Sequence, residues 1–147
     1  MQREIKHTWF FNQPPKEVWE YLTTPELLEQ WLMKTDFQPL VGHKFRFMTK
    51  PSDDCNYDKI IDCEVLEIEP FTKISYSWKG HAHNGKYSFD SKVIWTLIPL
   101  EDGTELQLVH NGFKVLEDLV SHNNGWALIG SRLIELLKTT TNVNTNP

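Results

Sequence analysis

The chain has 147 residues, a net charge of −5 and 39% hydrophobic residues, as expected for one globular domain with its own core. It contains no basic patch, no apolar run long enough to cross a membrane, and no apolar stretch of a signal peptide in its opening residues. These features exclude nucleic acid and a transmembrane anchor from the expected roles. Cys55 and Cys63 lack CxxC spacing and are interpreted as reduced thiols of a cytoplasmic protein.

Aromatic residues are frequent, at 12% of the chain with six tryptophans. Large rings close a core, and they also line pockets for apolar ligands. The composition alone therefore leaves both uses open.

The first part of the chain predicts a strand and two short helices. Residues Ile5–Phe11 alternate between apolar and polar side chains, which indicates a strand. The segments NQPPKEVWEYL (12–22) and TTPELLEQWL (23–32) each carry proline at the third position and then place apolar residues at helical spacing. Proline suits a first helical turn. In the second helix we expect Thr24 to act as the N-cap and Pro25 to be the first helical residue.

The middle of the chain predicts a run of antiparallel strands. Their segments are HKFRFMT (43–49), IIDCEVLEIEP (60–70), TKISYSW (72–78), SKVIWTLIPL (91–100) and TELQLVHNGF (104–113). The apolar phase of the second segment shifts along its length, which indicates a β-bulge. Its carboxylates point outward in this pattern and are interpreted as surface charge. Asn84-Gly85 and the EDG at 101–103 predict tight turns between neighbouring strands.

One long helix is predicted at His122–Leu137. Trp126, Gly130, Leu133 and Leu137 fall on one of its faces, which we expect to be buried. The sequence therefore predicts an α+β fold, with a curved antiparallel sheet wrapped round a long C-terminal helix and two short helices after the first strand.

The domain is assigned to residues 1–140. The polar residues 141–147 show no periodicity and are expected to form a disordered tail.

Four segments carry a pattern that is specific when they occur together in this order: NQPPKEVWEYLTTPELLEQW (12–31), EVLEIEPFTKISYSW (64–78), DGTELQLVHNGF (102–113) and GWALIGSRLIELL (125–137). Together they resemble the family related to the activator of the heat-shock-protein-90 ATPase. That family belongs to the START-like, or SRPBCC, superfamily, which shares the helix-grip fold of the birch-pollen allergen. The pattern departs from its relatives at Cys63, where they commonly carry glycine, and over residues 49–61.

The resemblance implies an apolar cavity between the sheet and the long helix. Our leading hypothesis is a small-molecule binding protein that holds an apolar or amphipathic ligand, such as a lipid or an aromatic or polyketide-like metabolite. Alternatives are a chaperone accessory of the heat-shock-protein-90 ATPase activator type, and a cyclase- or hydrolase-like enzyme that uses the same cavity. A homodimer and a role in the stress response are left open, and no cofactor is expected.

Eight residues are expected to line this cavity: Trp31, Phe45, Tyr76, Trp78, Trp95, His110, Trp126 and Gly130. Gly130 either leaves space beside the Trp126 indole or lets the sheet approach the helix closely. Gly125 is expected to admit a neighbouring strand or loop. His110 lies on an inward strand face, as a ligand anchor, a proton carrier or a satisfied core group.

No catalytic or metal site is predicted. The sequence has no GxSxG, P-loop, HExxH or Rossmann glycine motif. His81 and His83 share a strand face but flank a predicted turn, with no third ligand nearby. No residue is therefore assigned a catalytic or metal-binding role.

Overall fold

The computed structural model describes residues 4–48, 60–81 and 87–145. Its elements in chain order are β1 (Glu4–Phe11), α1 (Pro15–Thr23), α2 (Pro25–Trp31), β2 (Lys34–Thr35), β3 (Lys44–Met48), β4 (Ile60–Glu69), β5 (Lys73–His81), β6 (Tyr87–Leu100), β7 (Gly103–Asn111) and α3 (Leu116–Thr145). The strands form one antiparallel sheet in the order β1-β7-β6-β5-β4-β3-β2.

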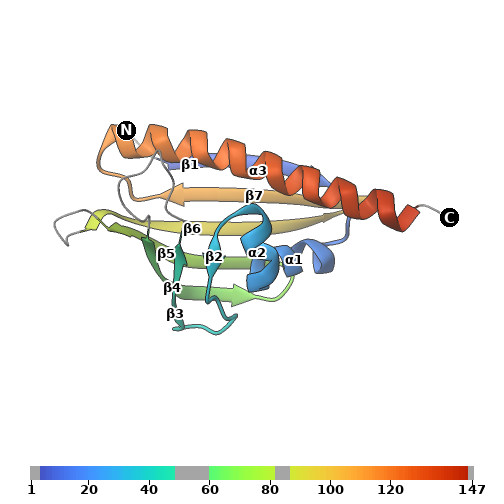
Figure 1. The fold of residues 1–147 in the computed structure, drawn as a ribbon, viewed down its shortest axis with the longest axis horizontal. Coiled ribbons are helices and arrows are strands. Elements are labelled where there is room, and N and C mark those ends of the chain that lie inside the picture. The colour runs from blue at the N-terminus through green and yellow to red at the C-terminus, as the bar shows by residue number, and fades with distance from the viewer. Residues whose placement is uncertain (1–3, 49–59, 82–86, 146–147) are drawn as a thin grey trace.

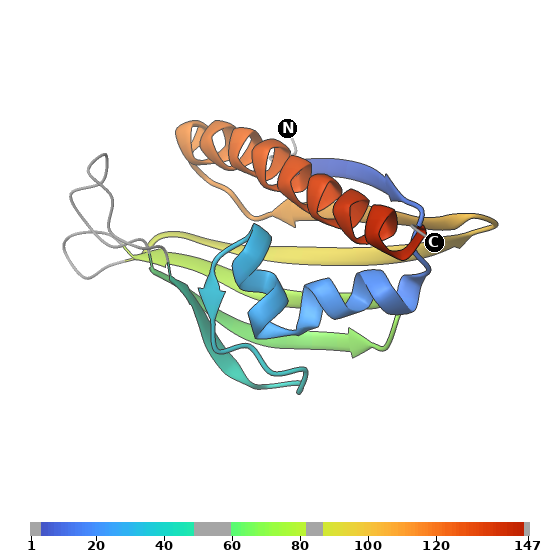
Figure 2. The same ribbon diagram turned by 45° about the vertical axis from the view of Figure 1, so that its right-hand side comes forward.

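The sheet curls around one layer of helices. α3 crosses the sheet beside β1 and β7, and α1 and α2 cover the same face next to it (Figures 1 and 2). The predicted α+β helix-grip fold is confirmed.

The two short helices begin and end where the prolines place them. Pro15 and Pro25 occupy the first positions of α1 and α2, where the missing N–H of proline costs nothing. Thr24 is the N-cap residue of α2, as predicted, but its side chain makes no capping hydrogen bond. Each helix buries its apolar side chains, including Trp19 in α1 and Trp31 in α2.

The bulge and one of the two turns are confirmed. The pairing of β4 with β5 shifts register between Val65 and Glu67, which explains the change of apolar phase along β4 and adds local twist. A tight turn joins β6 to β7 after the Leu100–Gly103 pair. The predicted Asn84-Gly85 turn lies outside the described residues. Most of the segment 49–61, which departs from the family pattern, also does, since the structure describes only its residues 60 and 61.

The two-residue strand β2 was not predicted. It pairs with the end of β3, Lys34 with Met48 and Thr35 with Phe47, and it is too short to show any periodicity.

The long helix starts earlier and ends later than predicted. It begins at Leu116 rather than His122, with Glu117 and Asp118 in its first turn, where acidic side chains are favoured by the helix dipole. It continues to Thr145, past residue 140, so the division into a domain and a disordered tail stays a prediction.

The predicted buried face of α3 is confirmed. The side chains of Trp126, Leu133 and Leu137 are 2%, 1% and 1% exposed, and Gly130 on the same face is also buried.

Candidate functional site

The seven side chains predicted to line the interior come together beneath α3. They come from six elements and are at most 3% exposed: Trp31, Phe45, Tyr76, Trp78, Trp95, His110 and Trp126. We call this set the aromatic interior.

Ring contacts connect the aromatic interior from β3 to α3. The ring centroids of Phe45 and Tyr76 are 5.4 Å apart, and those of Tyr76 and Trp78 are 6.4 Å apart. Trp126 bridges the helix to the sheet, 5.3 Å from Trp78 and 5.6 Å from Trp95. These separations lie in the range of favourable aromatic pairs, so the rings form one connected, mutually stabilising cluster.

His110 is held by hydrogen bonds on both ring nitrogens. The indole Nε1–H of Trp126 donates to His110 Nδ1 at 2.9 Å, and an indole can only donate. The proton of the neutral imidazole must therefore sit on Nε2, which is 2.7 Å from Ser91 Oγ. Ser91 in turn donates its hydroxyl hydrogen to the backbone oxygen of Trp78 at 2.8 Å. In this chain of hydrogen bonds Trp126 donates to His110, His110 to Ser91, and Ser91 to the Trp78 backbone oxygen, so each donor group is used once.

This network keeps His110 neutral. Burial, with a smaller repulsion from His122, lowers the pKa of His110 from 6.5 to about 2, because a buried imidazolium loses its hydration. Of the three roles that the sequence left open for this residue, the geometry is that of a satisfied core group.

The Ser91–His110 pair superficially resembles a nucleophile with its base. A general base needs an unprotonated nitrogen facing the serine hydroxyl. Here the indole of Trp126 occupies Nδ1 as a donor and forces the proton onto the nitrogen that faces Ser91. Both residues are also buried, Ser91 being 6% and His110 0% exposed. The pair is therefore arranged to hold the core together and not to activate a nucleophile.

A second histidine links α3 to the sheet. The indole Nε1–H of Trp78 donates to His122 Nε2 at 3.3 Å, so His122 Nδ1–H donates to the Asp118 backbone oxygen, 2.8 Å away. His122 was not predicted to take part in the site. The signal that could have found it is its position one helical turn before Trp126 on the same side of α3.

Deeper in the sheet, Trp95 Nε1–H donates to the Tyr76 hydroxyl at 2.9 Å. Burial raises the pKa of Tyr76 above its ordinary value, so this hydroxyl stays protonated at any physiological pH. Within the described residues, no buried side-chain nitrogen or oxygen is left without a hydrogen-bond partner.

Gly130 permits close packing. A Cβ at this position would overlap the indole of Trp9, which comes from β1 and lies 6.1 Å, centroid to centroid, from Trp95. Of the two interpretations left open by the sequence, the close approach of helix and sheet is the one observed. Trp9 was not assigned to the site, although its place on the inward face of its strand was visible in the sequence.

The surroundings of Gly125 differ from the prediction. A Cβ added to it would meet no atom within 4 Å, so no neighbouring strand or loop is packed against it. Nothing steric in the described structure requires glycine there.

The two parts of α3 are attached to the sheet very differently. From Trp126 to Leu137 a residue is buried on every turn, and Gln13 Nε2 also donates to the Leu137 backbone oxygen at 2.8 Å. From Leu116 to Gly125 no residue is fully buried. This segment is held through the Trp78–His122 hydrogen bond and through His7 Nε2, which is 3.0 Å from Asn123 Oδ1. Partly buried Leu119 also packs against the core, and the His122 ring lies 4.9 Å from Phe113 and 5.3 Å from His110, centroid to centroid.

A separate groove lies on the outer face of β3, β4 and β5. Its volume is about 500 Å³, and we call it the outer groove. Residues that alternate with the buried core positions supply most of its lining, which consists of Asp36, Lys44, Phe45, Arg46, Asp62, Cys63, Glu64, Ser77 and Lys79. The sequence suggested only surface charge here.

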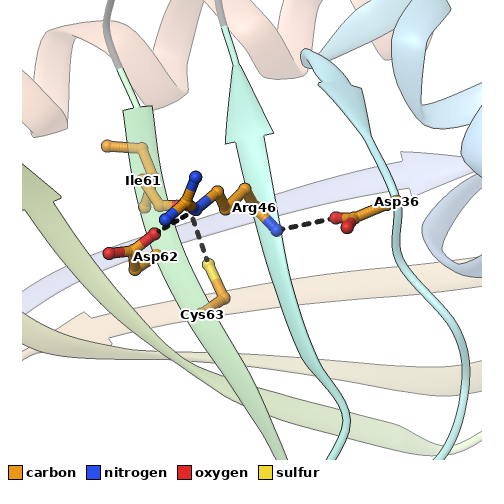
Figure 3. Close-up of polar contacts among 5 residues, drawn as sticks. All are labelled: Asp36, Arg46, Ile61, Asp62 and Cys63. Atoms are coloured by element: carbon orange, nitrogen blue, oxygen red, sulfur yellow. Dashed lines mark hydrogen bonds and ion pairs between the residues drawn. The ribbon is translucent and has the colours of Figure 1, made fainter.

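Figure 3 shows the polar contacts on one side of the outer groove. The Arg46 side chain extends from β3 to Asp62 on β4, with Nε 2.8 Å from Oδ1. Asp36 accepts a hydrogen bond from the Arg46 backbone N–H at 2.8 Å. Cys63 is a free, buried thiol whose Sγ is 3.9 Å from the Ile61 backbone oxygen. Burial, with smaller contributions from Asp62 and Asp36, raises its pKa, so the thiol is unreactive.

No metal centre is found in the part of the chain that the structure describes, where no three His, Cys, Asp or Glu side chains gather around a common point. The imidazoles of His81 and His83 and the thiol of Cys55 lie outside the described side chains. Of the helices in the described ranges, none is long and apolar enough to span a bilayer.

Similar folds occur in solved structures. A protein from Mesorhizobium loti is 33% identical, with a TM-score of 0.81 over 93% of this chain and 98% of that one. DynU16, from the dynemicin biosynthetic locus, is 21% identical with a TM-score of 0.80, and the match covers 95% of this chain and 49% of that protein. The Aha1 dimer from Colwellia psychrerythraea, solved in solution, is 19% identical with a TM-score of 0.71, covering 91% and 95%.

A search of curated proteins found no match. The sequence profile of the family described as "Activator of Hsp90 ATPase homolog 1-like protein" matches residues 12–138. This match spans α1 to α3 and contains every residue of the aromatic interior, so the chain belongs to the family of Activator of Hsp90 ATPase homolog 1-like proteins.

Proposed function

We propose that the protein binds a small apolar or amphipathic molecule between the sheet and the first turns of α3. The observation that carries this proposal is the unequal attachment of α3, in which Leu116–Gly125 has no fully buried residue while Trp126–Leu137 is anchored on every turn. The weakly attached segment lies against the aromatic interior through the hydrogen bond from Trp78 to His122. Of these two parts of α3, 116–125 and 126–137, it is therefore the one that costs less to displace.

The chemistry beneath this segment favours an apolar ligand. The ring centroids of Trp78 and Trp126 are 5.3 Å apart with the ring planes tilted by 51°, and their N–H groups already have partners within the protein. A ligand that enters here meets ring faces with few open polar groups, which suits an alkyl chain or an aromatic ring system.

Gly125 is suited to act as the hinge. It separates the weakly attached segment from the anchored one, and its replacement by alanine would meet no steric obstacle. A glycine inside a helix lowers the cost of local bending, because it costs about 1 kcal/mol of helix stability relative to alanine. We propose that residues 116–124 swing about Gly125, with release of the Trp78–His122 hydrogen bond, to admit the ligand.

Of the eight residues expected to contact a ligand, Trp78 and Trp126 would contact it first. Phe45, Tyr76 and Trp95 would form the deeper wall of the site. Trp31, His110 and Gly130 serve this wall indirectly, because Trp31 packs behind Trp95, His110 orients Trp126, and Gly130 receives Trp9. The proposal keeps the cytoplasmic location expected from the sequence.

The binding test uses decanoate and 1-anilinonaphthalene-8-sulfonate as probes, followed by tryptophan and probe fluorescence. We expect saturable binding of both probes to the folded protein and displacement of one by the other. Absence of saturable binding, or probe signals that appear only with unfolding, would contradict the proposal.

The entry route is tested by stopped-flow association of the same probes. Gly125→Ala should slow association about fivefold, if opening becomes harder by about 1 kcal/mol. Ser131→Ala is the matched control, because it lies at an exposed site on the anchored part of α3 and also raises helix propensity. Equal association rates for Gly125→Ala and the unmodified protein, or equal slowing by both variants, would contradict the proposal that Gly125 is the hinge.

A second candidate, a chaperone accessory, is favoured by the family match. Its test is the ATPase rate of a heat-shock-protein-90 chaperone with and without this chain. A dose-dependent increase would support it, and an unchanged rate together with no binding would contradict it. By analogy with the Aha1 dimer from Colwellia psychrerythraea, we propose that this chain forms a homodimer. Light scattering of the same sample measures its oligomeric state.

A further inference from the structure

The outer groove is a second concave site, on the face of the sheet opposite to α3, and it has a different chemistry from the aromatic interior. Its volume of about 500 Å³ falls in the range of small-molecule sites. We propose that the outer groove binds a small zwitterion, whose carboxylate lies at Lys44 and whose ammonium group lies at Glu64.

The balance of charge selects this class of ligand. Three basic and three acidic side chains line the groove, so neither a simple anion nor a simple cation finds a field of one sign there. A molecule with both charges can place each of them beside an opposite partner.

Three of these six charged side chains, Arg46, Asp62 and Lys79, belong to a row of opposite charges across the sheet. Arg46 pairs in register with Asp62, Asp62 with Lys79, and Lys79 with Asp90. The Arg46 Nε–Asp62 Oδ1 contact is 2.8 Å and the Lys79 Nζ–Asp90 Oδ2 contact is 4.0 Å. The row alternates in sign, and its members Arg46, Asp62 and Lys79 line the groove; Figure 3 shows the Arg46–Asp62 contact.

Asp36 lies outside this row, and its carboxylate accepts the Arg46 backbone N–H. The two charged side chains that remain are Lys44 and Glu64. They are opposite partners in the register of β3 and β4, yet among the residues that the structure describes neither forms an ion pair within 4.0 Å. The Glu64 backbone N–H donates to Ser77 Oγ at 2.9 Å, which fixes the local backbone where the Glu64 side chain begins. An ammonium donor and a carboxylate acceptor thus stand close together with capacity for one ligand that carries both charges.

The spacing of the two ligand charges can be measured with a series of amino acids. Glycine, β-alanine and γ-aminobutyrate carry the same two groups at increasing separation. Each is titrated into the ¹⁵N-labelled protein while the amide shifts of the whole chain are followed. Acetate and methylammonium, each with one of the two charges, are the matched single-charge probes.

We expect at least one member of the series to give saturable shifts confined to β3, β4 and β5, with a Kd at least tenfold below those of acetate and methylammonium. Lys44→Gln and Glu64→Gln should each weaken that binding about tenfold or more, since each removes a charged hydrogen bond. Lys138→Gln, an exposed charge on α3, should leave it unchanged.

Three results would overturn the proposal: no saturable shift with any zwitterion, equal affinity for acetate or methylammonium, or binding that survives both groove variants. The same variants leave the aromatic interior intact. Decanoate binding by Lys44→Gln and Glu64→Gln therefore separates a failure of this proposal from a failure of the proposed interior site.

Discussion

The same substitution at two glycines of α3 should change stability in opposite directions. Replacing glycine with alanine in a helix interior gains about 1 kcal/mol when the methyl group finds space. At Gly125 the new Cβ meets no atom within 4 Å, so Gly125→Ala should raise the free energy of unfolding by about 1 kcal/mol.

At Gly130 the new Cβ overlaps the indole of Trp9. That ring cannot easily retreat, because it stacks on His7 at 5.4 Å and contacts Trp95 at 6.1 Å. Overpacking of this kind costs about 1–3 kcal/mol. A ring held on two sides belongs to the upper end of that range, so after subtraction of the propensity gain Gly130→Ala should lower stability by about 2 kcal/mol.

Urea denaturation, monitored by circular dichroism at 222 nm, measures both values under the same conditions. The two variants should differ by about 3 kcal/mol, and their melting temperatures should move apart by roughly 6–12 °C for a chain of this size. Shifts of the same sign and similar size in the two variants would refute the assignment of Gly130 as a close contact and of Gly125 as an unconstrained position.

Three further predictions concern the polar groups. Burial holds the folded-state pKa of His110 at about 2 against 6.5 when unfolded, so the contribution of the neutral imidazole to stability is fully present above pH 6.5 and is lost as the pH falls. Between pH 7.5 and 5 the protein should lose about 2 kcal/mol of stability. His110→Gln should abolish this pH dependence, and its persistence in that variant would contradict the assignment to His110. Trp126→Phe leaves His110 Nδ1 buried without its donor and should cost about 1–3 kcal/mol in urea unfolding, whereas a loss of under about 0.5 kcal/mol would show that the bond contributes little. Arg46→Gln breaks a pair with Asp62 whose side chains are 56% and 22% exposed, so thermal unfolding should report a loss of at most about 1 kcal/mol, and a larger loss would mean that the outer groove is structurally essential.

Much of the fold could be predicted because local patterns agreed with the global arrangement. Alternation identified the strands, the phase shift in β4 marked its bulge, and proline marked the starts of α1 and α2. The start of α3 was missed because Leu116 and Val120 are exposed at 59% and 50%, so this part of the helix has no buried apolar stripe to reveal it.

The candidate site could be predicted only as a set of inward-facing rings. The partner of His110 depends on how α3 crosses the sheet, and no sequence spacing specifies that Trp126 should reach its Nδ1 atom. Likewise, Gly130 indicated either space or close approach, and the side chain that decides between them, Trp9, comes from the other end of the chain. The outer groove depends on the register of three strands, which turns ordinary surface charges such as Lys44 and Glu64 into neighbours.

The central claim is that the first turns of α3 open over the aromatic interior to admit an apolar ligand. Hydrogen–deuterium exchange of the full chain, with and without saturating decanoate, tests this claim most directly. We predict that amides of residues 120–125 exchange much faster than those of 126–137 in the free protein and become protected when decanoate is bound. Equal exchange along the whole of α3, or exchange of residues 120–125 that decanoate does not change, would contradict the account.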